Sequence, residues 1–195
     1  MRFLDQVDRE AIPQLLARDE YFWLDLDGPG DEEAQFLAET FHFHPLALED
    51  MGKRGQRPKL EDFDDYVFLV YYGAGEKAGA KGEAELQEVH AFVSGSYIVT
   101  VHVGPIEALA EAREHLQAQP PRSEQFVVYR VLDGLTDSFF PVLERLDDEM
   151  ERLDEAIFDE PSPAHLERIT QLRRQLVELR RVASPQRDLL ARGTD

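Results

Sequence analysis

The sequence predicts an α/β chain in two parts, an α/β domain over residues 1–119 and a helical hairpin over residues 120–195. Two observations lead to this fold class. Short apolar segments of strand length alternate with amphipathic helical patterns as far as residue 119. Beyond Pro120-Pro121, large apolar residues recur at spacings of three and four over long stretches, which is typical of extended helices. The double proline separates the two patterns and predicts the boundary.

Four apolar segments predict the β-strands of the first part. They are residues 20–26, 66–72, 89–94 and 97–103. The second segment is apolar on both faces, which favours a central strand. The last two segments flank Gly95 and predict a β-hairpin. Between the second and third segments, residues 73–82 are rich in glycine and alanine, and we expect a loop there.

Helices are predicted between the first two strands and after the last one. Residues 31–40 form an amphipathic pattern with Asp31 as the expected N-cap. A new short helix begins at Pro45, because proline is favoured at the first turn, and it ends at Gly52. We expect Leu46 and Leu48 to bury this helix. Residues 106–117 predict another amphipathic helix.

Two long helices are predicted in the second part. The first runs through residues 132–157 and contains Pro141, which should kink or destabilise it. Ser162-Pro163 starts the second helix, and the short connection predicts an antiparallel hairpin. The first helix is rich in acidic residues and the second in arginine, which predicts a weak attraction between them. The second helix is still helical in pattern at residues 188–190, so we expect a truncated stalk helix that continues in a longer protein.

The net charge of the chain indicates which kinds of molecule it can bind. The 195 residues include 40 acidic and 21 basic side chains, for a formal net charge of −19. Such a surface repels phosphate backbones and excludes nucleic acid as an expected partner, whereas it attracts cations. The absence of cysteine rules out disulfides and thiolate metal sites and fits a reducing cytoplasm. No stretch approaches the roughly 18 apolar residues of a membrane-spanning helix, so we expect none within this sequence.

Motifs for catalysis are missing from the sequence. No serine or histidine stands in a nucleophile motif, and the glycines of residues 73–82 lack the pattern of a phosphate-binding loop. His42 and His44 have a spacing that could hold zinc on a strand, but no third ligand lies nearby in the sequence. His44 precedes a proline and is better explained as a turn residue. We therefore expect a protein that is not an enzyme.

Glu49 and Asp50 are the first candidate metal ligands. Adjacent residues on a helix point about 100° apart, so these two carboxylates cannot both clasp one ion at close range without another group. Each can reach a different neighbour. Oxygen ligands of this kind suit Mg²⁺ or Ca²⁺, which commonly retain several waters. The alternative is that both are ordinary solvated acids at a helix end.

Several blocks of the sequence occur in the order found in one known family. They are residues 44–50 (HPLALED), 56–61 (QRPKLE), 65–68 (DYVF), 97–102 (YIVTVH), 132–144 (LDGLTDSFFPVLE), 171–174 (QLRR) and 179–187 (LRRVASPQR). Together they resemble the cytoplasmic N-terminal domain of the CorA family of divalent-cation channels and magnesium transporters. The resemblance implies a mixed β-sheet sandwiched between helices, then a long antiparallel helical hairpin leading to a stalk helix. In the family the stalk continues into transmembrane helices, which this sequence does not contain.

The resemblance also implies a function. In the family, regulatory Mg²⁺ bridges neighbouring subunits of a homopentamer on the cytoplasmic side of the inner or plasma membrane and favours the closed pore. The positions that match the metal-site residues are Glu49, Asp50 and Asp133. Co²⁺ or Zn²⁺ are further candidates for the transported ion. The fragment alone should be monomeric or weakly associated. Two alternatives stay open: a zinc transporter of the ZntB type, and a free-standing soluble cation-binding protein of the same fold.

Overall fold

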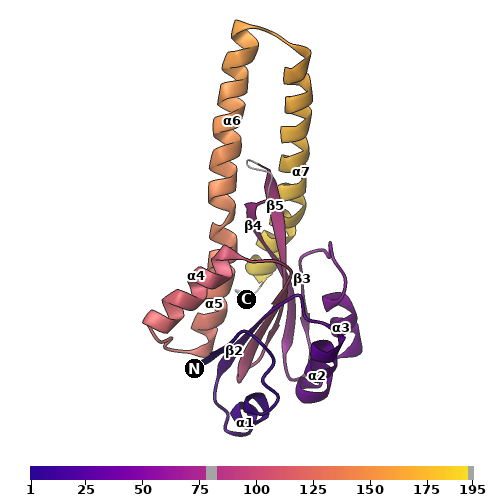
Figure 1. Ribbon diagram of the computed structural model, residues 1–195, viewed down its shortest axis with the longest axis vertical. Coiled ribbons are helices and arrows are strands. Elements are labelled where there is room, and N and C mark those ends of the chain that lie inside the picture. The colour runs from indigo at the N-terminus through magenta and orange to yellow at the C-terminus, as the bar shows by residue number, and fades with distance from the viewer. Residues whose placement is uncertain (78–82, 193–195) are drawn as a thin grey trace.

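The computed structural model describes residues 1–77 and 83–192, and a six-stranded mixed sheet lies at its centre (Figure 1). The strands are β1 (Arg2–Leu4), β2 (Phe22–Asp27), β3 (Lys59–Asp62), β4 (Val67–Glu76), β5 (Ala84–Val93) and β6 (Tyr97–His102). The helices are α1 (Ala11–Ala17), α2 (Asp31–Phe41), α3 (Pro45–Met51), α4 (Glu107–Ala118), α5 (Glu124–Asp137), α6 (Phe139–Asp159) and α7 (Pro163–Arg192).

The sheet has the order β1-β2-β6-β5-β4-β3. Strand β2 is parallel to both β1 and β6, and the remaining pairs are antiparallel. The pairing of β5 with β6 across residues 94–96 confirms the predicted hairpin. Strand β4 lies between β5 and β3 and is buried on both faces, which confirms that it is an internal strand.

Helices cover both faces of the sheet, and each face has its own hydrophobic core. One core joins the sheet to α1, α2, α3 and parts of α6 and α7, and the other joins it to α4 and α5. The predicted sandwich of a mixed sheet between helices is therefore confirmed. Val127, Val131 and Leu135 of α5 lie in the second core, so the packing continues across the boundary predicted at residues 119 and 120. That division into domains stays a prediction.

The predicted loop over residues 73–82 is wrong for its first part, because β4 continues to Glu76. Glycine is needed here for close packing: a Cβ on Gly73 would lie 3.0 Å from Leu135 Cδ2 and 3.0 Å from Ser138 Oγ. The glycine-rich composition therefore reflects a strand against which the end of α5 packs closely. The rest of that prediction, residues 78–82, lies outside the described residues.

The predicted first long helix is divided in two, with α5 ending and α6 beginning around Ser138. The Ser138 hydroxyl donates to the Leu135 carbonyl and accepts the backbone N–H of Ala74, both at the same junction. Pro141 is consequently the third residue of α6. At that position a backbone N–H would have no partner within the helix, so proline costs little. The break explains how the sequence accommodates Pro141.

A smaller correction concerns the start of α2. Its N-cap is Gly30, and Asp31 is the first helical residue. The Glu33 carboxylate accepts the backbone N–H of Gly30 at 2.9 Å. Because Asp31, Glu32 and Glu33 all lie in the first turn, their charges still favour the helix N-terminus.

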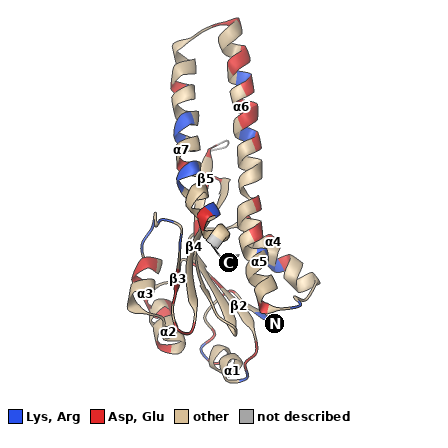
Figure 2. Ribbon diagram, turned by 180° about the vertical axis from the view of Figure 1, so that it is seen from behind, with Lys and Arg blue, Asp and Glu red and all other residues tan. Residues whose placement is uncertain are grey.

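Helices α6 and α7 form the predicted antiparallel hairpin, which extends well beyond the sheet (Figure 1). Acidic residues predominate on α6 and arginines on α7 (Figure 2). Arg168 and Glu149 form an ion pair across the hairpin. Near its tip the apolar side chains are open to solvent, with Phe158 91% exposed and Leu166 69% exposed. None of the helices in residues 1–77 and 83–192 combines the length and apolarity needed to cross a bilayer.

Candidate functional site

Helix α3 is fixed at its start by His44. The His44 Nδ1 accepts the backbone N–H of Leu46 at 3.2 Å, and the His44 backbone N–H donates to the Tyr66 hydroxyl at 2.8 Å. Pro45 occupies the first helical position, where no N–H is required. His44 is therefore an N-capping residue, as a turn role predicts, while His42 ends α2 with a positive φ of 55°.

One face of α3 packs against the core, and Glu49 and Asp50 lie outside that face. Ala47 and Met51 are buried, whereas Leu46 is 60% exposed, so the expectation that Leu46 buries the helix is wrong. Leu48 is partly buried against the core. The buried residues are four apart, the spacing that places them on one helical face.

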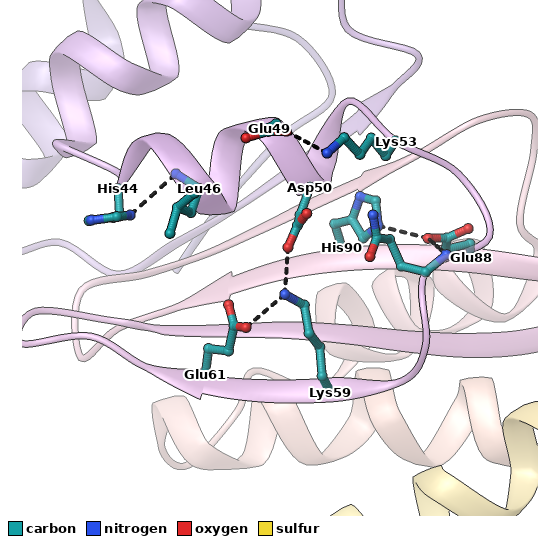
Figure 3. A network of polar contacts seen from close by, with 10 residues as sticks. His44, Leu46, Glu49, Asp50, Lys53, Lys59, Glu61, Glu88 and His90 are labelled. Atoms are coloured by element: carbon teal, nitrogen blue, oxygen red, sulfur yellow. Dashed lines mark hydrogen bonds and ion pairs between the residues drawn. The ribbon is translucent and has the colours of Figure 1, made fainter.

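The two candidate carboxylates of α3 each contact a different lysine (Figure 3). Glu49 pairs with Lys53 one turn later, and Asp50 pairs with Lys59 at the start of β3. Lys59 also lies 2.8 Å from Glu61 Oε1, so one ammonium group serves two carboxylates. Partial burial alone would lower the pKa of Lys59, but the hydrogen bonds to Asp50 and Glu61 outweigh it and raise the pKa.

Exposure makes these carboxylates available to a cation from solvent. The Glu49 side chain is 57% exposed and that of Asp50 is 23% exposed. The partnership of Lys59 with Asp50 was not recognised from the sequence. The signal was present, because Lys59 and Glu61 alternate on a strand and must share one face.

Asp133 lies apart from this pair. It is on α5, which packs on the opposite face of the sheet from α3, and its carboxylate is 3.0 Å from Arg130 Nη1. The structure therefore does not bring Asp133 together with Glu49 and Asp50 within one chain. In the part of the chain that is described, no three His, Asp or Glu side chains are grouped so that they could hold a metal ion.

A buried polar cluster that the sequence did not reveal lies beside α3. Glu88 and His90 on β5 are 8% and 1% exposed, with His90 Nε2 2.9 Å from Glu88 Oε1 (Figure 3). The Glu88 carboxylate also accepts the backbone N–H groups of Gly55 at 2.6 Å and Gln56 at 3.1 Å. Burial opposes the charged form of Glu88, but these hydrogen bonds outweigh it and lower its pKa. This cluster holds the loop between α3 and β3.

A second buried network lies on the other face, near the ends of β2 and β6. Trp23 Nε1 donates to Thr100 Oγ1 at 2.8 Å, and the Thr100 hydroxyl donates to the Asp25 carboxylate. His102 Nε2 is 3.3 Å from Asp25 Oδ1, and its Nδ1 is 2.7 Å from the Gly104 carbonyl. Burial alone would lower the pKa of His102, but Asp25 and the carbonyl of Gly104 reverse this and raise it.

Comparison with known proteins identifies relatives of this chain. The sequence model of the family described as CorA-like Mg2+ transporter protein matches residues 18–194. The putative metal ion transporter YfjQ of Bacillus subtilis is 33% identical over 175 residues, which cover 88% of this chain and 53% of YfjQ. The cobalt/magnesium transport protein CorA of Thermotoga maritima is 29% identical, over 87% of this chain and 49% of that protein. The chain spans about half the length of these two relatives.

Solved structures share the fold. The soluble domain of CorA from Methanocaldococcus jannaschii superposes with a TM-score of 0.73 at 22% identity, over 87% of this chain and 68% of that one. The ZntB cytoplasmic domain from Vibrio parahaemolyticus gives a TM-score of 0.64 at 15% identity, over 89% of this chain and 70% of that one. Because the family model matches nearly the whole sequence, the chain belongs to the CorA-like Mg2+ transporter family, whose members are ion transporters and not enzymes.

Proposed function

We propose that this chain is the cytoplasmic Mg²⁺-sensing domain of a CorA-like magnesium channel, and that divalent cations bridging neighbouring copies favour the closed pore. The observation that carries the proposal is the placement of the candidate ligands. Glu49 and Asp50 lie on the α3 side of the sheet and Asp133 on the α5 side. Relatives named as magnesium and cobalt/magnesium transport proteins support the choice of ion.

Ligands on opposite sides of one chain suit a closed ring of identical copies. In a ring, each contact is heterologous and joins one surface of a copy to a different surface of its neighbour. The α3 carboxylates of one copy and Asp133 of the next can then share an ion that neither copy could hold alone. This arrangement would apply to the homopentamer that the family resemblance implies.

Charge provides the driving force for this bridging. A copy with a formal charge of −19 repels its neighbours, and divalent cations at each contact reduce that repulsion. Without a divalent cation, Lys53 and Lys59 neutralise the same carboxylates within one chain. A bridging ion therefore competes with lysine, and this competition keeps each site weak.

Weak sites are sufficient if several act together. Moving an equilibrium between open and closed states from 1:99 to 99:1 needs about 5.5 kcal/mol of differential binding. A tenfold preference for the closed state is worth about 1.4 kcal/mol at each contact. Five such contacts supply about 7 kcal/mol, which exceeds that requirement.

A zinc-transporting protein is the second candidate, because the ZntB cytoplasmic domain shares the fold. The site residues favour magnesium over zinc. Glu49, Asp50 and Asp133 offer only carboxylate oxygens, which suit Mg²⁺, whereas zinc sites commonly include histidine or cysteine. His44 is occupied as a helix cap.

The test is Asp50→Asn in the full-length protein, assayed by protection from trypsin as Mg²⁺ is raised. Asparagine keeps the size of the side chain but removes its charge, so we expect half-maximal protection to require at least threefold more Mg²⁺. Asp64→Asn, an exposed change between β3 and β4, is the matched control and should behave as the unmodified protein. Unchanged protection in Asp50→Asn would overturn the assignment of this site.

A further inference from the structure

A cleft lies between the loop that joins α3 to β3 and the C-terminal half of α7. Its volume is about 620 Å³, and its walls are residues 55–58 on one side and α7 residues between Val177 and Pro185 on the other. The cleft differs from the rest of this acidic molecule in its charge. Three arginines, Arg57, Arg180 and Arg181, line it, and none of the described residues in its walls carries a carboxylate.

These guanidinium groups are not neutralised by ion pairs in the described ranges. The arginines that pair with carboxylates in residues 1–77 and 83–192 are others, namely Arg130, Arg145, Arg168 and Arg187. The charges of Arg181 and of Arg54 also act on the Tyr72 hydroxyl, where they oppose the effect of burial on its pKa. Positive charge from the loop and from α7 thus acts on the same hydroxyl group.

Hydrogen bonds hold both walls of the cleft in position. On the loop side, Glu88 accepts the N–H groups of Gly55 and Gln56, and the Tyr72 hydroxyl donates to the Gln56 carbonyl at 2.6 Å. On the helix side, Gln186 of α7 bonds the backbone of Tyr72 through its Oε1 at 2.8 Å and its Nε2 at 3.2 Å. Preformed walls lower the entropic cost of binding a ligand.

Pro185 lies inside α7 and is one of the residues that line the cleft. Proline has no backbone N–H, so the carbonyl of Arg181 one turn earlier lacks its usual helical donor. Gln56 and Ser184, which can both donate and accept hydrogen bonds, also line the cleft. The lining therefore combines several positive charges with a few neutral polar groups and the apolar surfaces of Pro58, Val177 and Val182.

We propose that this cleft binds a small multivalent oxyanion, such as a phosphate-bearing or polycarboxylate metabolite. The guanidinium group has a planar arrangement of donors that matches phosphate and carboxylate groups in bidentate fashion. The volume lies within the range of roughly 300–1,000 Å³ that is typical of sites for small molecules. A bound anion would connect α7 to the loop that follows α3, because it contacts both.

The experiment is isothermal titration calorimetry of this chain in Mg²⁺-free buffer with pyrophosphate, orthophosphate and citrate. We expect pyrophosphate to bind with 1:1 stoichiometry and more weakly as salt is raised. Arg57→Gln combined with Arg181→Gln should weaken its binding at least tenfold. The matched control is Arg173→Gln combined with Arg174→Gln, which removes the same charge from exposed positions of α7 outside the cleft. Stronger binding of pyrophosphate than of citrate would assign the ligand to the phosphate class, and the reverse to the polycarboxylates.

Three results would overturn the proposal. The first is no binding of any of the three anions, and the second is equal weakening by the two double variants, which would indicate general charge attraction. The third is self-association of the chain, measured by sedimentation velocity, that is lost only in the cleft variant, because the cleft would then hold acidic residues of another copy. Circular dichroism checks folding, and the single variant Arg180→Gln replaces the double variant if that one unfolds.

Discussion

Two groups of carboxylates lie on either side of the loop that joins α3 to β3, and they differ in burial and in partners. Glu88 is 8% exposed, and its oxygens accept hydrogen bonds from His90 and from two backbone N–H groups. Glu49 and Asp50 are more exposed and each contacts the flexible end of a lysine. In the first arrangement, fixed donors within the protein satisfy a buried carboxylate. In the second, a cation from solvent can replace the lysine that contacts each carboxylate.

The difference indicates a structural role for Glu88 and fits the binding role proposed for Glu49 and Asp50. A buried carboxylate with fixed donors cannot turn toward a metal without breaking those bonds and leaving buried groups unpaired. The ion pair of Glu49 with Lys53 is exposed and contributes little to folding, and that of Asp50 with Lys59 is partly exposed. Exchanging lysine for a divalent ion therefore costs less than breaking the bonds of Glu88. We therefore expect substitutions in the two groups to act on different measurements.

The largest expected effect is that of Glu88→Gln on stability. Glutamine keeps the shape of the side chain but offers only one acceptor oxygen. Its amide nitrogen would face either the backbone N–H of Gly55 or the donors of Gln56 and His90. We expect the free energy of unfolding to fall by about 3 kcal/mol, the scale measured when one partner of a buried pair is removed. Urea denaturation followed by circular dichroism measures this loss.

Glu85→Gln is the matched control for this change, because Glu85 is on the same strand and exposed. It should alter the free energy of unfolding by less than about 0.5 kcal/mol. Linkage supplies a second check. The pKa of Glu88 is lowered by folding, so its contribution is present above the ordinary pKa of 4.5 and is lost as the pH falls below that value. If Glu88→Gln and Glu85→Gln were equally stable, the structural role of Glu88 would be wrong.

The exposed group could be predicted from the sequence and the buried group could not, for a physical reason. Pro45 and Gly52 determine where α3 begins and ends, so adjacent acids near its end could be found by local rules alone. The contact of Glu88 with His90 spans only two residues of one strand. The other two hydrogen bonds of Glu88 come from backbone N–H groups 32 and 33 positions away in the sequence, and no local pattern encodes them.

Register and close packing also limited the prediction. Residues 73–76 have the composition of a loop, yet β4 pairs with β5 as far as Glu76. The glycine at position 73 leaves the space into which the end of α5 packs. Asp133 could be named from the family resemblance, but its position on the opposite face of the sheet from α3 required the three-dimensional structure.

A smaller effect is expected for His102, and it depends on pH. The pKa of His102 is raised by folding, so its contribution to stability is complete below 6.5 and is lost as the pH rises through the folded value. We expect the free energy of unfolding to fall by about 1 kcal/mol between pH 6 and pH 9, the scale of one charge-assisted hydrogen bond. In His102→Gln this part of the pH dependence should be absent, and an unchanged pH profile would contradict the assignment. Urea denaturation at a series of pH values measures it.

The smallest effect on stability is expected at Lys59, where a substitution should strengthen the binding of Mg²⁺. Lys59→Met keeps an apolar chain against Phe68 but frees Asp50 and Glu61, so the free energy of unfolding should change by less than about 1 kcal/mol. Removing the competing ammonium group should lower the Mg²⁺ concentration for half-maximal protection of the full-length protein from trypsin. Arg174→Met, an exposed change on α7 that removes the same charge, controls for net charge. A requirement for more Mg²⁺ in Lys59→Met than in that control would mean that lysine supports the site and does not compete with the ion.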